Sequence, residues 1–354
     1  MELIEEMVIQ HTKNSQLPSL NWENLEFGRY NSDHMLICDY SGGRWQAASI
    51  RPFANLSLSP MALCLHYGHT IFEGMKAFRL QDGRINIFRP QKHISRMARS
   101  AERMCMPVIP EEIFLEGLAR LLELDGDWVS PREGYSLYIR PFMIATQPRL
   151  GVKISEEYRF MIITSPCGTY YERPLTVKVE CKFVRAAKGG TGYAKCGGNY
   201  GGSLYPARQA KLEGYDQVIW TDSEENRLIE ESGTMNIMFV IGGWLVTPPL
   251  TDSIIDGVTR DSVLTLARHI GLHIEERPVS VEELSEGLKK GLITEAFGTG
   301  TAAALSYISN IGIGGINYDL TAPPEKGLAF RLKKELDNIR TGRSPDLFGW
   351  NHIL

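Results

Sequence analysis

The pattern of hydrophobic and polar positions predicts a strand-rich first half that also contains two helices. Apolar runs on either side of the turn dipeptide Asp82-Gly83 indicate a β-hairpin between MKAFRL and RINIF. Pro90 then opens a run with a period of 3.6 residues, which predicts a helix to about Cys105. A second amphipathic run predicts a helix over 111–124, ended by Asp125-Gly126.

The helix predicted after Pro90 has two chemically different faces. Its apolar face contains Ile94, Met97, Ala98 and Ala101, and its basic face contains Lys92, Arg96, Arg99 and Arg103. Taken alone, a basic helix face is most often solvated, so Arg96 by itself indicates no ligand site.

In the second half, short strands and helices follow one another without the strict alternation of a parallel sheet. The segment PCGTYYERP has no apolar periodicity and is bounded by prolines, so we interpret it as a linker. This predicts a small N-terminal domain (1–165), a linker (166–175) and a large domain (176–354), with an α+β or mixed α/β fold. Further helices are predicted near 204–213, 259–270, 281–290 and 324–339.

Composition and charge exclude several classes of protein. The chain has 354 residues, 43% hydrophobic and 23% charged, with a net charge of −4, so it presents no basic field for nucleic acid or anionic lipid. Its six cysteines include no C-x-x-C pair, which argues against structural zinc, and in a chain of this length without a secretory signal we expect them to be reduced thiols. The acidic start MELIEEMVIQ does not look like an export signal, and no apolar run could span a bilayer, so we expect a cytoplasmic protein.

Common cofactor and catalytic motifs are absent or weak. Gly298 to Ala303 matches the dinucleotide pattern G-x-G-x-x-A, but the following ALSYISNIGIGGI does not have the character of a crossover helix. No phosphate-binding G-x-x-x-x-G-K-[ST] occurs, and GGSLY fails the G-x-S-x-G pattern at its last position. We expect His66 and His69 to pack and form local hydrogen bonds rather than bind metal.

The unusual segment of the chain is 189–202, which is dense in glycine around a single central lysine, Lys195. Such a density of glycine costs chain entropy, so it indicates positions where the backbone must approach another group closely. A lysine held in a shaped loop can act as a nucleophilic amine and form a Schiff base with a carbonyl, including that of pyridoxal phosphate. A flexible surface loop is the alternative.

Two further features match that chemistry. Gly257-Val258-Thr259-Arg260 opens a predicted helix whose N–H groups could bind phosphate, and Gly298 to Thr301 could form a second phosphate cradle. Glu230 and Glu231 lie in a predicted strand and therefore on opposite faces, so one can face water while the other points inward. An inward carboxylate suits the ring nitrogen of a pyridine cofactor.

The chain resembles the branched-chain amino acid aminotransferases of the class-IV pyridoxal phosphate family. The matching segments, in family order between 65 and 304, are LHYGHTIFEGMKAFR, IFRPQKHISRMARSAERM, LYIRPF, GTGYAKCGGNYG, EESGTMN, GVTRDSVL and FGTGTAAA. The resemblance implies a small α/β domain, a larger domain with a mixed β-barrel-like core, and a cofactor in the cleft between them. It implies transfer of the amino group of L-leucine, L-isoleucine or L-valine to 2-oxoglutarate, in branched-chain amino acid biosynthesis or breakdown.

The resemblance also implies a role for each matched residue. Lys195 would bind the cofactor covalently and shuttle the proton. The remaining cofactor contacts would come from Arg96, Val258, Thr259 and Thr301 at the phosphate, Tyr200 at the 3-oxygen, Glu231 at the ring nitrogen and Ile255 against the ring. Tyr67, Phe72 and Tyr138 would line the side-chain pocket, while Arg140, Thr234, Ala302 and Ala303 would place the substrate. The loop 147–152, through Leu150 and Val152, would cover the partner's site in a homodimer.

Two departures and three alternatives accompany this interpretation. Ala303 and Ser306 stand where some relatives have a C-x-x-C pair, so no redox switch of that kind is expected, and Asp256 replaces a usual proline. The nearest alternative is another class-IV enzyme, a D-amino acid aminotransferase or aminodeoxychorismate lyase. The others are a nicotinamide-dependent oxidoreductase and a non-catalytic binding protein with the same fold.

Overall fold

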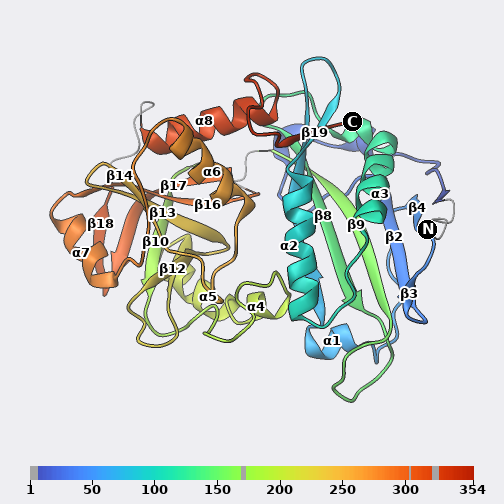
Figure 1. Ribbon diagram of the computed structural model, residues 1–354, viewed down its shortest axis with the longest axis horizontal. Coiled ribbons are helices and arrows are strands. Elements are labelled where there is room, and N and C mark those ends of the chain that lie inside the picture. Colours follow the sequence, from blue (N-terminus) through green and yellow to red (C-terminus); the bar gives the residue numbers. More distant parts are fainter. Residues whose placement is uncertain (1–6, 169–172, 303, 321–326) are drawn as a thin grey trace. The chain divides into compact units, whose positions relative to one another are not determined.

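A computed structural model describes residues 7–168, 173–302, 304–320 and 327–354. The chain divides into two compact units (Figure 1). Unit 1 comprises Met1–Tyr170, Ala194–Gly198 and Ile339–Leu354, and unit 2 comprises Tyr171–Tyr193 and Asn199–Asn338. The segment that carries Lys195 therefore belongs with the first unit, although it lies far along the chain.

Unit 1 is built on one mixed sheet. The order of its strands is β1-β4-β2-β9-β8-β6-β7-β19, with β3 paired to β2 and β5 paired to β8. The strands are β1 Val8–Ile9, β2 His34–Ser41, β3 Arg44–Trp45, β4 Ser49–Pro52, β5 Thr70–Phe72, β6 Met75–Arg79, β7 Ile85–Phe88, β8 Ser136–Ala145, β9 Tyr158–Cys167 and β19 Asn351–Ile353. The predicted hairpin is confirmed, because β6 and β7 pair antiparallel.

Two long helices, α2 and α3, lie along this sheet (Figure 1). The helical elements of unit 1 are α1 Leu63–Tyr67, α2 Pro90–Arg103, α3 Glu111–Leu124 and the 3-10 turns Leu17–Ser19, Trp22–Asn24 and Gly126–Trp128. Both predicted long helices are confirmed. Their apolar residues, among them Met97 and Leu118, join Leu36 and Ile139 of the sheet in one buried core. Burial of this apolar surface is the main term that stabilises the unit.

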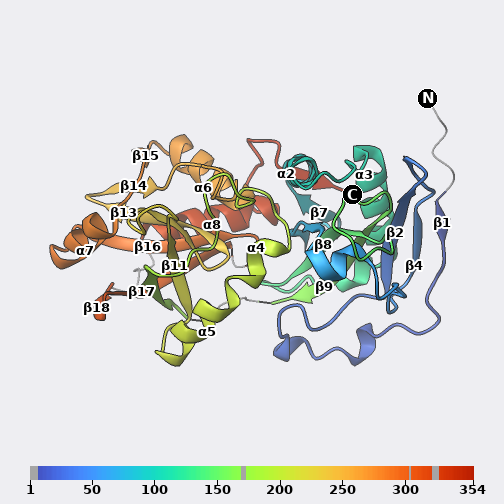
Figure 2. The same cartoon turned by 90° about the horizontal axis from the view of Figure 1, so that it is seen from below.

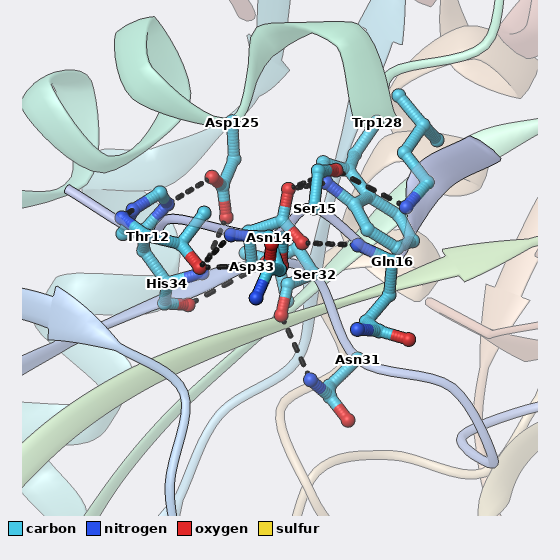
Figure 3. A network of polar contacts seen from close by, with 12 residues as sticks. Thr12, Asn14, Ser15, Gln16, Asn31, Ser32, Asp33, His34, Asp125 and Trp128 are labelled. Carbon is cyan, nitrogen blue, oxygen red and sulfur yellow. Dashed lines mark hydrogen bonds and ion pairs between the residues drawn. The ribbon is translucent and has the colours of Figure 1, made fainter. Parts of the chain in front are cut away.

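A polar network attaches the N-terminal segment to this unit (Figure 3). The main-chain N–H of Thr12 donates to His34 Nε2 at 2.9 Å, so the ring proton lies on Nδ1, which donates to Asp125 Oδ1 at 2.5 Å. Asp33 accepts from the indole of Trp128 at 3.0 Å. His34 and Asp125 are almost wholly buried, so these bonds replace the lost hydration of both groups.

Unit 2 contains a second mixed sheet that closes on itself. Its strand order is β12-β11-β10-β17-β16-β13-β14-β15, and an additional β12–β13 pairing closes a ring. The strands are β10 Leu175–Glu180, β11 Gln217–Thr221, β12 Ile229–Ser232, β13 Met235–Ile241, β14 Trp244–Thr247, β15 Ile274–Glu276, β16 Ile293–Gly300, β17 Ala304–Ile313 and β18 Ile316–Asp319. The segment Ala304–Ile313 is thus a strand, as its β-branched and glycine pattern indicates, and not a crossover helix.

The helices of unit 2 follow the predicted positions closely. They are α5 Leu204–Leu212, α6 Val258–His269 and α7 Val281–Lys289, while α4 Gly198–Gly201 and α8 Leu328–Arg340 each begin in one unit and end in the other. Helix α5 packs beside β10 and β11 (Figure 2). The predicted start of the last helix at 324 lies outside the described residues. None of the helices described in 7–168, 173–302, 304–320 and 327–354 is long and apolar enough to cross a membrane.

Candidate active site

The segment around Lys195 is held in unit 1 by main-chain hydrogen bonds. The N–H of Lys195 donates to Ser100 Oγ at 2.9 Å, and the carbonyl of Lys195 accepts from the N–H of Phe72 at 3.0 Å. The backbone of Cys196 forms an isolated antiparallel β-bridge with that of Ile71, and the N–H of Gly197 donates to the carbonyl of Thr70. The lysine backbone is therefore fixed on both sides, which argues against the alternative of a flexible surface loop.

Glycine at position 197 is required by the close approach of this segment to β5. A Cβ atom there would lie 2.4 Å from Thr70 Oγ1, well inside van der Waals contact. The density of glycine therefore has a physical reason at this position, as the sequence indicated.

The Phe72 ring lies near both the Lys195 side chain and the guanidinium of Arg140. The Nζ of Lys195 lies 4.6 Å from the centroid of the Phe72 ring, and the Arg140 guanidinium lies 4.8 Å from the same centroid. Arg140 also donates to the hydroxyl of Tyr138 at 2.9 Å. Unit 1 thus brings together Lys195, Phe72, Tyr138 and Arg140, an amine next to aromatic walls and a guanidinium that can bind a carboxylate.

Arg96 is also in unit 1, but not on a solvated face. Its side chain is buried, and its guanidinium forms a two-pronged ion pair with Glu73, Nε to Oε1 and Nη2 to Oε2, each at 2.7 Å. The expectation that this basic face is solvated is wrong for Arg96, because the turn between β5 and β6 brings Glu73 against α2. Lys92 and Arg99 of the same face are exposed.

The other predicted residues of unit 1 are accessible. Tyr67 is 42% exposed and donates a hydrogen bond to the carbonyl of Leu150. Leu150 and Val152 are 59% and 79% exposed, which leaves two apolar side chains on a loop open to solvent. His66 has a ring nitrogen 2.8 Å from the main-chain oxygen of Pro60, which confirms its local hydrogen bond, whereas the His69 ring nitrogen lies 2.8 Å from the main-chain oxygen of the distant Met104.

In unit 2, Glu231 is a buried carboxylate held by polar partners from other segments. It accepts from the N–H of Ile255 at 2.9 Å and from Asn236 Nδ2 at 3.3 Å, and it pairs with Arg185 Nε at 2.8 Å. Arg185 and Asn236 were missed by the sequence reasoning. A signal existed for Asn236, which lies in EESGTMN only five residues after Glu231.

Glu230 lies on the opposite face of β12 from Glu231 but is also buried. It is 8% exposed, its Oε1 accepts from the Ser253 hydroxyl, and burial raises the pKa of its carboxyl to about 7. The expectation that one of this pair faces solvent is therefore wrong. The strand alternation is as predicted, but the 248–254 segment covers the outer face.

The predicted phosphate-binding segments adjoin Glu231 through strand register. Glu231 pairs with Asn236, and Asn236 pairs with Thr299, two residues before Thr301. Gly257, the N-cap of α6, lies so close to Asn236 that a Cβ atom would be 2.0 Å from its Oδ1. The start of α6, with Val258 and Thr259, and the end of β16 are thereby placed around one asparagine.

Three more predicted residues lie in the part of the chain that the structure describes. Tyr200 lies in α4, next to Asn199, whose Nδ2 donates to the carbonyl of Thr191 at 2.8 Å and thereby braces the loop. Thr234 is exposed in the turn between β12 and β13, and Ala302 follows β16 and Thr301. Ala303 lies outside the described residues.

The family match defines the class of protein, a pyridoxal-phosphate-dependent transaminase. The chain belongs to the family described as Amino-transferase class IV, whose sequence profile matches residues 70–311. The fold expected for this family, mixed α/β with a closed sheet, is confirmed, and so is the resemblance on which that expectation rested.

Named relatives of this family are similar in sequence to this protein over nearly the whole chain. Branched-chain-amino-acid transaminase 1 of Bacillus subtilis (strain 168) is 44% identical, covering 99% of this chain and 98% of the relative. The branched-chain-amino-acid aminotransferase of Mycolicibacterium smegmatis is 43% identical, covering 92% and 91%.

Solved structures agree as well. The branched-chain amino acid aminotransferase from Escherichia coli superposes with a TM-score of 0.70 at 26% identity, covering 89% of this chain and 98% of that one. The branched-chain amino acid aminotransferase from Thermobaculum terrenum, in its PLP form, gives a TM-score of 0.75 at 22% identity, covering 91% and 98%. At this lower identity the likeness concerns the fold alone.

Proposed function

We propose that this protein is a branched-chain amino acid transaminase that uses pyridoxal phosphate. It would transfer the amino group of L-leucine, L-isoleucine or L-valine to 2-oxoglutarate, giving the branched 2-oxo acid and L-glutamate. The observation that carries the proposal is the placement of the Lys195 side-chain nitrogen and the Arg140 guanidinium against one aromatic ring, that of Phe72. The names of the relatives support the substrate class.

The described residues suit the cofactor. Gly257 gives α6 no side-chain cap, so this helix of twelve residues starts with main-chain N–H groups suited to a phosphate. Thr299 Oγ1 is buried with no hydrogen-bond partner in the part of the chain that the structure describes. Buried polar atoms normally have a partner, so this orphan hydroxyl beside the β16 end is consistent with a polar ligand.

Each residue then has a task. Val258, Thr259 and Thr301 would bind the phosphate together with Arg96, Glu231 would accept from the ring nitrogen, Tyr200 would donate to the 3-oxygen, and Ile255 would pack on the ring. When bound, the cofactor supplies an electron sink for the substrate Cα. Lys195 would take the proton from the substrate Cα and deliver it to C4′ of the cofactor.

Substrate selection follows from the walls of unit 1. Phe72, Tyr138 and Tyr67 would accept an aliphatic side chain by apolar contact. In the second half-reaction, Arg140 would bind the distal carboxylate of glutamate, as charge-assisted bonds to guanidinium are strong and directional. Thr234 and Ala302, with Ala303, would place the α-carboxylate.

The test combines spectroscopy with assays on the purified holoprotein. We expect a visible absorption band that borohydride abolishes, and turnover of L-leucine, L-isoleucine and L-valine with 2-oxoglutarate but not of D-alanine. Lys195→Ala should lose both band and turnover. Lys188→Ala is the matched control, since Lys188 precedes the same loop and its side chain is 75% exposed. A colourless protein that takes up no pyridoxal phosphate, or preference for D-alanine, would overturn the proposal.

Domain boundaries, assembly and location are proposed on the same basis. We propose domains at 1–165 and 176–354 with the linker 166–175, in which 194–198 and 339–354 pack with the first unit, and a cytoplasmic homodimer. Exposed Leu150 and Val152 support the idea that their loop covers a partner's site. Val152→Asp should then inactivate the dimer, and mixing it with Lys195→Ala should restore activity in hybrid dimers. Failure of the mixture to regain activity would count against this arrangement.

A further inference from the structure

Glu73 is a buried carboxylate to which none of the functional roles above is assigned. Its side chain is fully buried, between Phe72 and Gly74 in the turn that joins β5 to β6. Its Oε1 pairs with Arg96 Nε and its Oε2 with Arg96 Nη2, while His93 Nδ1 lies 2.8 Å from Oε2. A two-pronged pair of this kind restrains the plane of the guanidinium as well as its distance.

The charges in this cluster are set by its surroundings. Burial would raise the pKa of the Glu73 carboxyl, but the charge of Arg96 and the hydrogen bonds from Arg96 and His93 outweigh burial, and the pKa lies well below its ordinary value. Burial lowers the pKa of His93, so its neutral ring donates from Nδ1. At neutral pH, Glu73 is therefore an anion that holds one cation and one neutral donor.

The same stretch of chain also holds Lys195. Phe72, the residue before Glu73, donates its N–H to the Lys195 carbonyl at 3.0 Å. On the helix side, Ser100 Oγ donates to the Arg96 carbonyl at 3.0 Å and accepts from the Lys195 N–H at 2.9 Å. A closed circuit of hydrogen bonds, ion pairs and chain bonds within unit 1 thus joins Lys195, Phe72, Glu73, Arg96 and Ser100.

We propose that Glu73 is a positioning residue that sets the orientation of Arg96 and its spacing from Lys195. This inference rests on the proposed function, in which Arg96 binds the phosphate end of the cofactor and Lys195 its aldehyde end. A rigid ligand bound at two points gains affinity only when those points are held at the matching distance. Glu73 is suited to this task because its carboxylate pairs with Arg96, while the preceding residue, Phe72, is hydrogen-bonded to the carbonyl of Lys195.

The test compares Glu73→Gln with a buried acid of the same unit that is outside this circuit. Asp125→Asn is the matched control, because it also removes a buried carboxylate charge paired with a histidine, His34. Apoprotein of each variant is titrated with pyridoxal phosphate, with pyridoxal and with inorganic phosphate, and its melting temperature is measured without ligand. Glu73→Gln should weaken pyridoxal phosphate binding about 10- to 100-fold and leave pyridoxal binding near the wild-type value. Asp125→Asn should lower the melting temperature without this selective loss.

A double-mutant cycle separates positioning from a general loss of structure. In an Arg96→Ala background, Glu73→Gln should have little further effect on pyridoxal phosphate affinity, since its partner is already gone. Equal losses for pyridoxal and pyridoxal phosphate, additive effects in the cycle, or wild-type affinity in Glu73→Gln would each overturn the inference. Failure of the proposed function is distinguishable, because the wild-type protein itself would then not take up the cofactor.

Discussion

The main-chain N–H of Lys195 donates a hydrogen bond of 2.9 Å to the side-chain oxygen of Ser100, 95 residues earlier in the chain. This bond crosses from the lysine segment to α2, and the same hydroxyl donates to the Arg96 carbonyl. Ser100 is almost wholly buried, so no water can readily replace it. The position of the lysine therefore depends on a helix whose sequence shows only an ordinary amphipathic pattern.

Ser100→Ala should impair turnover as well as stability. Removal of the hydroxyl leaves the N–H of Lys195 buried without an acceptor, at a cost of about 1–3 kcal/mol. We expect kcat to fall roughly 10-fold as the amine loses its alignment, with cofactor still bound. Steady-state kinetics and the visible spectrum check this. Ser32→Ala removes another buried hydroxyl of unit 1, bonded to Thr164, and should leave kcat unchanged. Equal kcat values for the two variants would contradict the prediction.

Arg185→Ala should destabilise unit 2 and reduce turnover. Arg185 is buried and pairs with Glu231 at 2.8 Å, so its removal leaves a buried carboxylate short of its counter-charge. Breaking such a pair typically costs about 3–5 kcal/mol. Thermal unfolding of the apoprotein measures the loss, and Arg227→Ala, which removes an arginine that is 57% exposed, is the control. Indistinguishable melting temperatures for these two variants would refute the role assigned to Arg185.

Glu230→Gln should stabilise the protein relative to wild type, by an amount that grows with pH. Burial raises the pKa of Glu230 from 4.5 to about 7, so the folded state binds its proton more tightly than the unfolded chain does. The free energy of unfolding of the wild type therefore decreases as pH rises from about 4.5 to about 7. Glutamine imitates the protonated form and avoids this loss, which we expect to be roughly 1–3 kcal/mol.

Melting temperatures of wild type and Glu230→Gln between about pH 5 and pH 8 test this dependence. Glu224→Gln is the control, because that carboxylate is 65% exposed and solvent screens its charge. A difference between wild type and Glu230→Gln that stays constant over this range, or shrinks with rising pH, is the result that would not be compatible with a buried, protonated Glu230.

Gly257→Ala should weaken cofactor binding with a modest loss of stability. The backbone at Gly257 has an ordinary φ of −71°, so strain comes only from the new Cβ, 2.0 Å from Asn236 Oδ1. Asn236 would have to turn, and with it lose its bonds to the Ile255 carbonyl and to Glu231. We expect pyridoxal phosphate affinity to drop about 10-fold or more. Gly202→Ala adds a methyl group with nothing within 4 Å and should change neither affinity nor stability. Wild-type affinity in Gly257→Ala would show that Asn236 does not brace this region.

Features that depend on nearby residues were predictable. The turn at Asp82-Gly83, the bounds of α3 and the strand character after Thr301 follow from local periodicity and turn chemistry. The candidate lysine was also recognisable, since glycine density around one amine is itself a local signal. Ordered motifs added the family, because seven of them in one sequence specify far more than any single pattern.

Features that depend on distant residues were not predictable. Glu230 alternates with Glu231 as expected, yet whether its outer face meets water depends on where 248–254 folds. In the sequence, Arg96 is one residue of a basic helix face. It is buried and paired only because the β5–β6 turn brings Glu73 to α2. In both cases the deciding partner lies about twenty residues or more away along the chain.

By itself, the sequence determined the element types and the family, and it indicated Lys195 as the candidate amine, because periodicity, turn residues and motif order are properties of neighbouring positions. The tertiary structure decided how that amine is held. It supplied Ser100 and Phe72 for the Lys195 backbone, Glu73 for Arg96, and Arg185 with Asn236 for Glu231. These partners come from separate strands and helices, and only the packing of buried apolar surface brings such elements within hydrogen-bond distance.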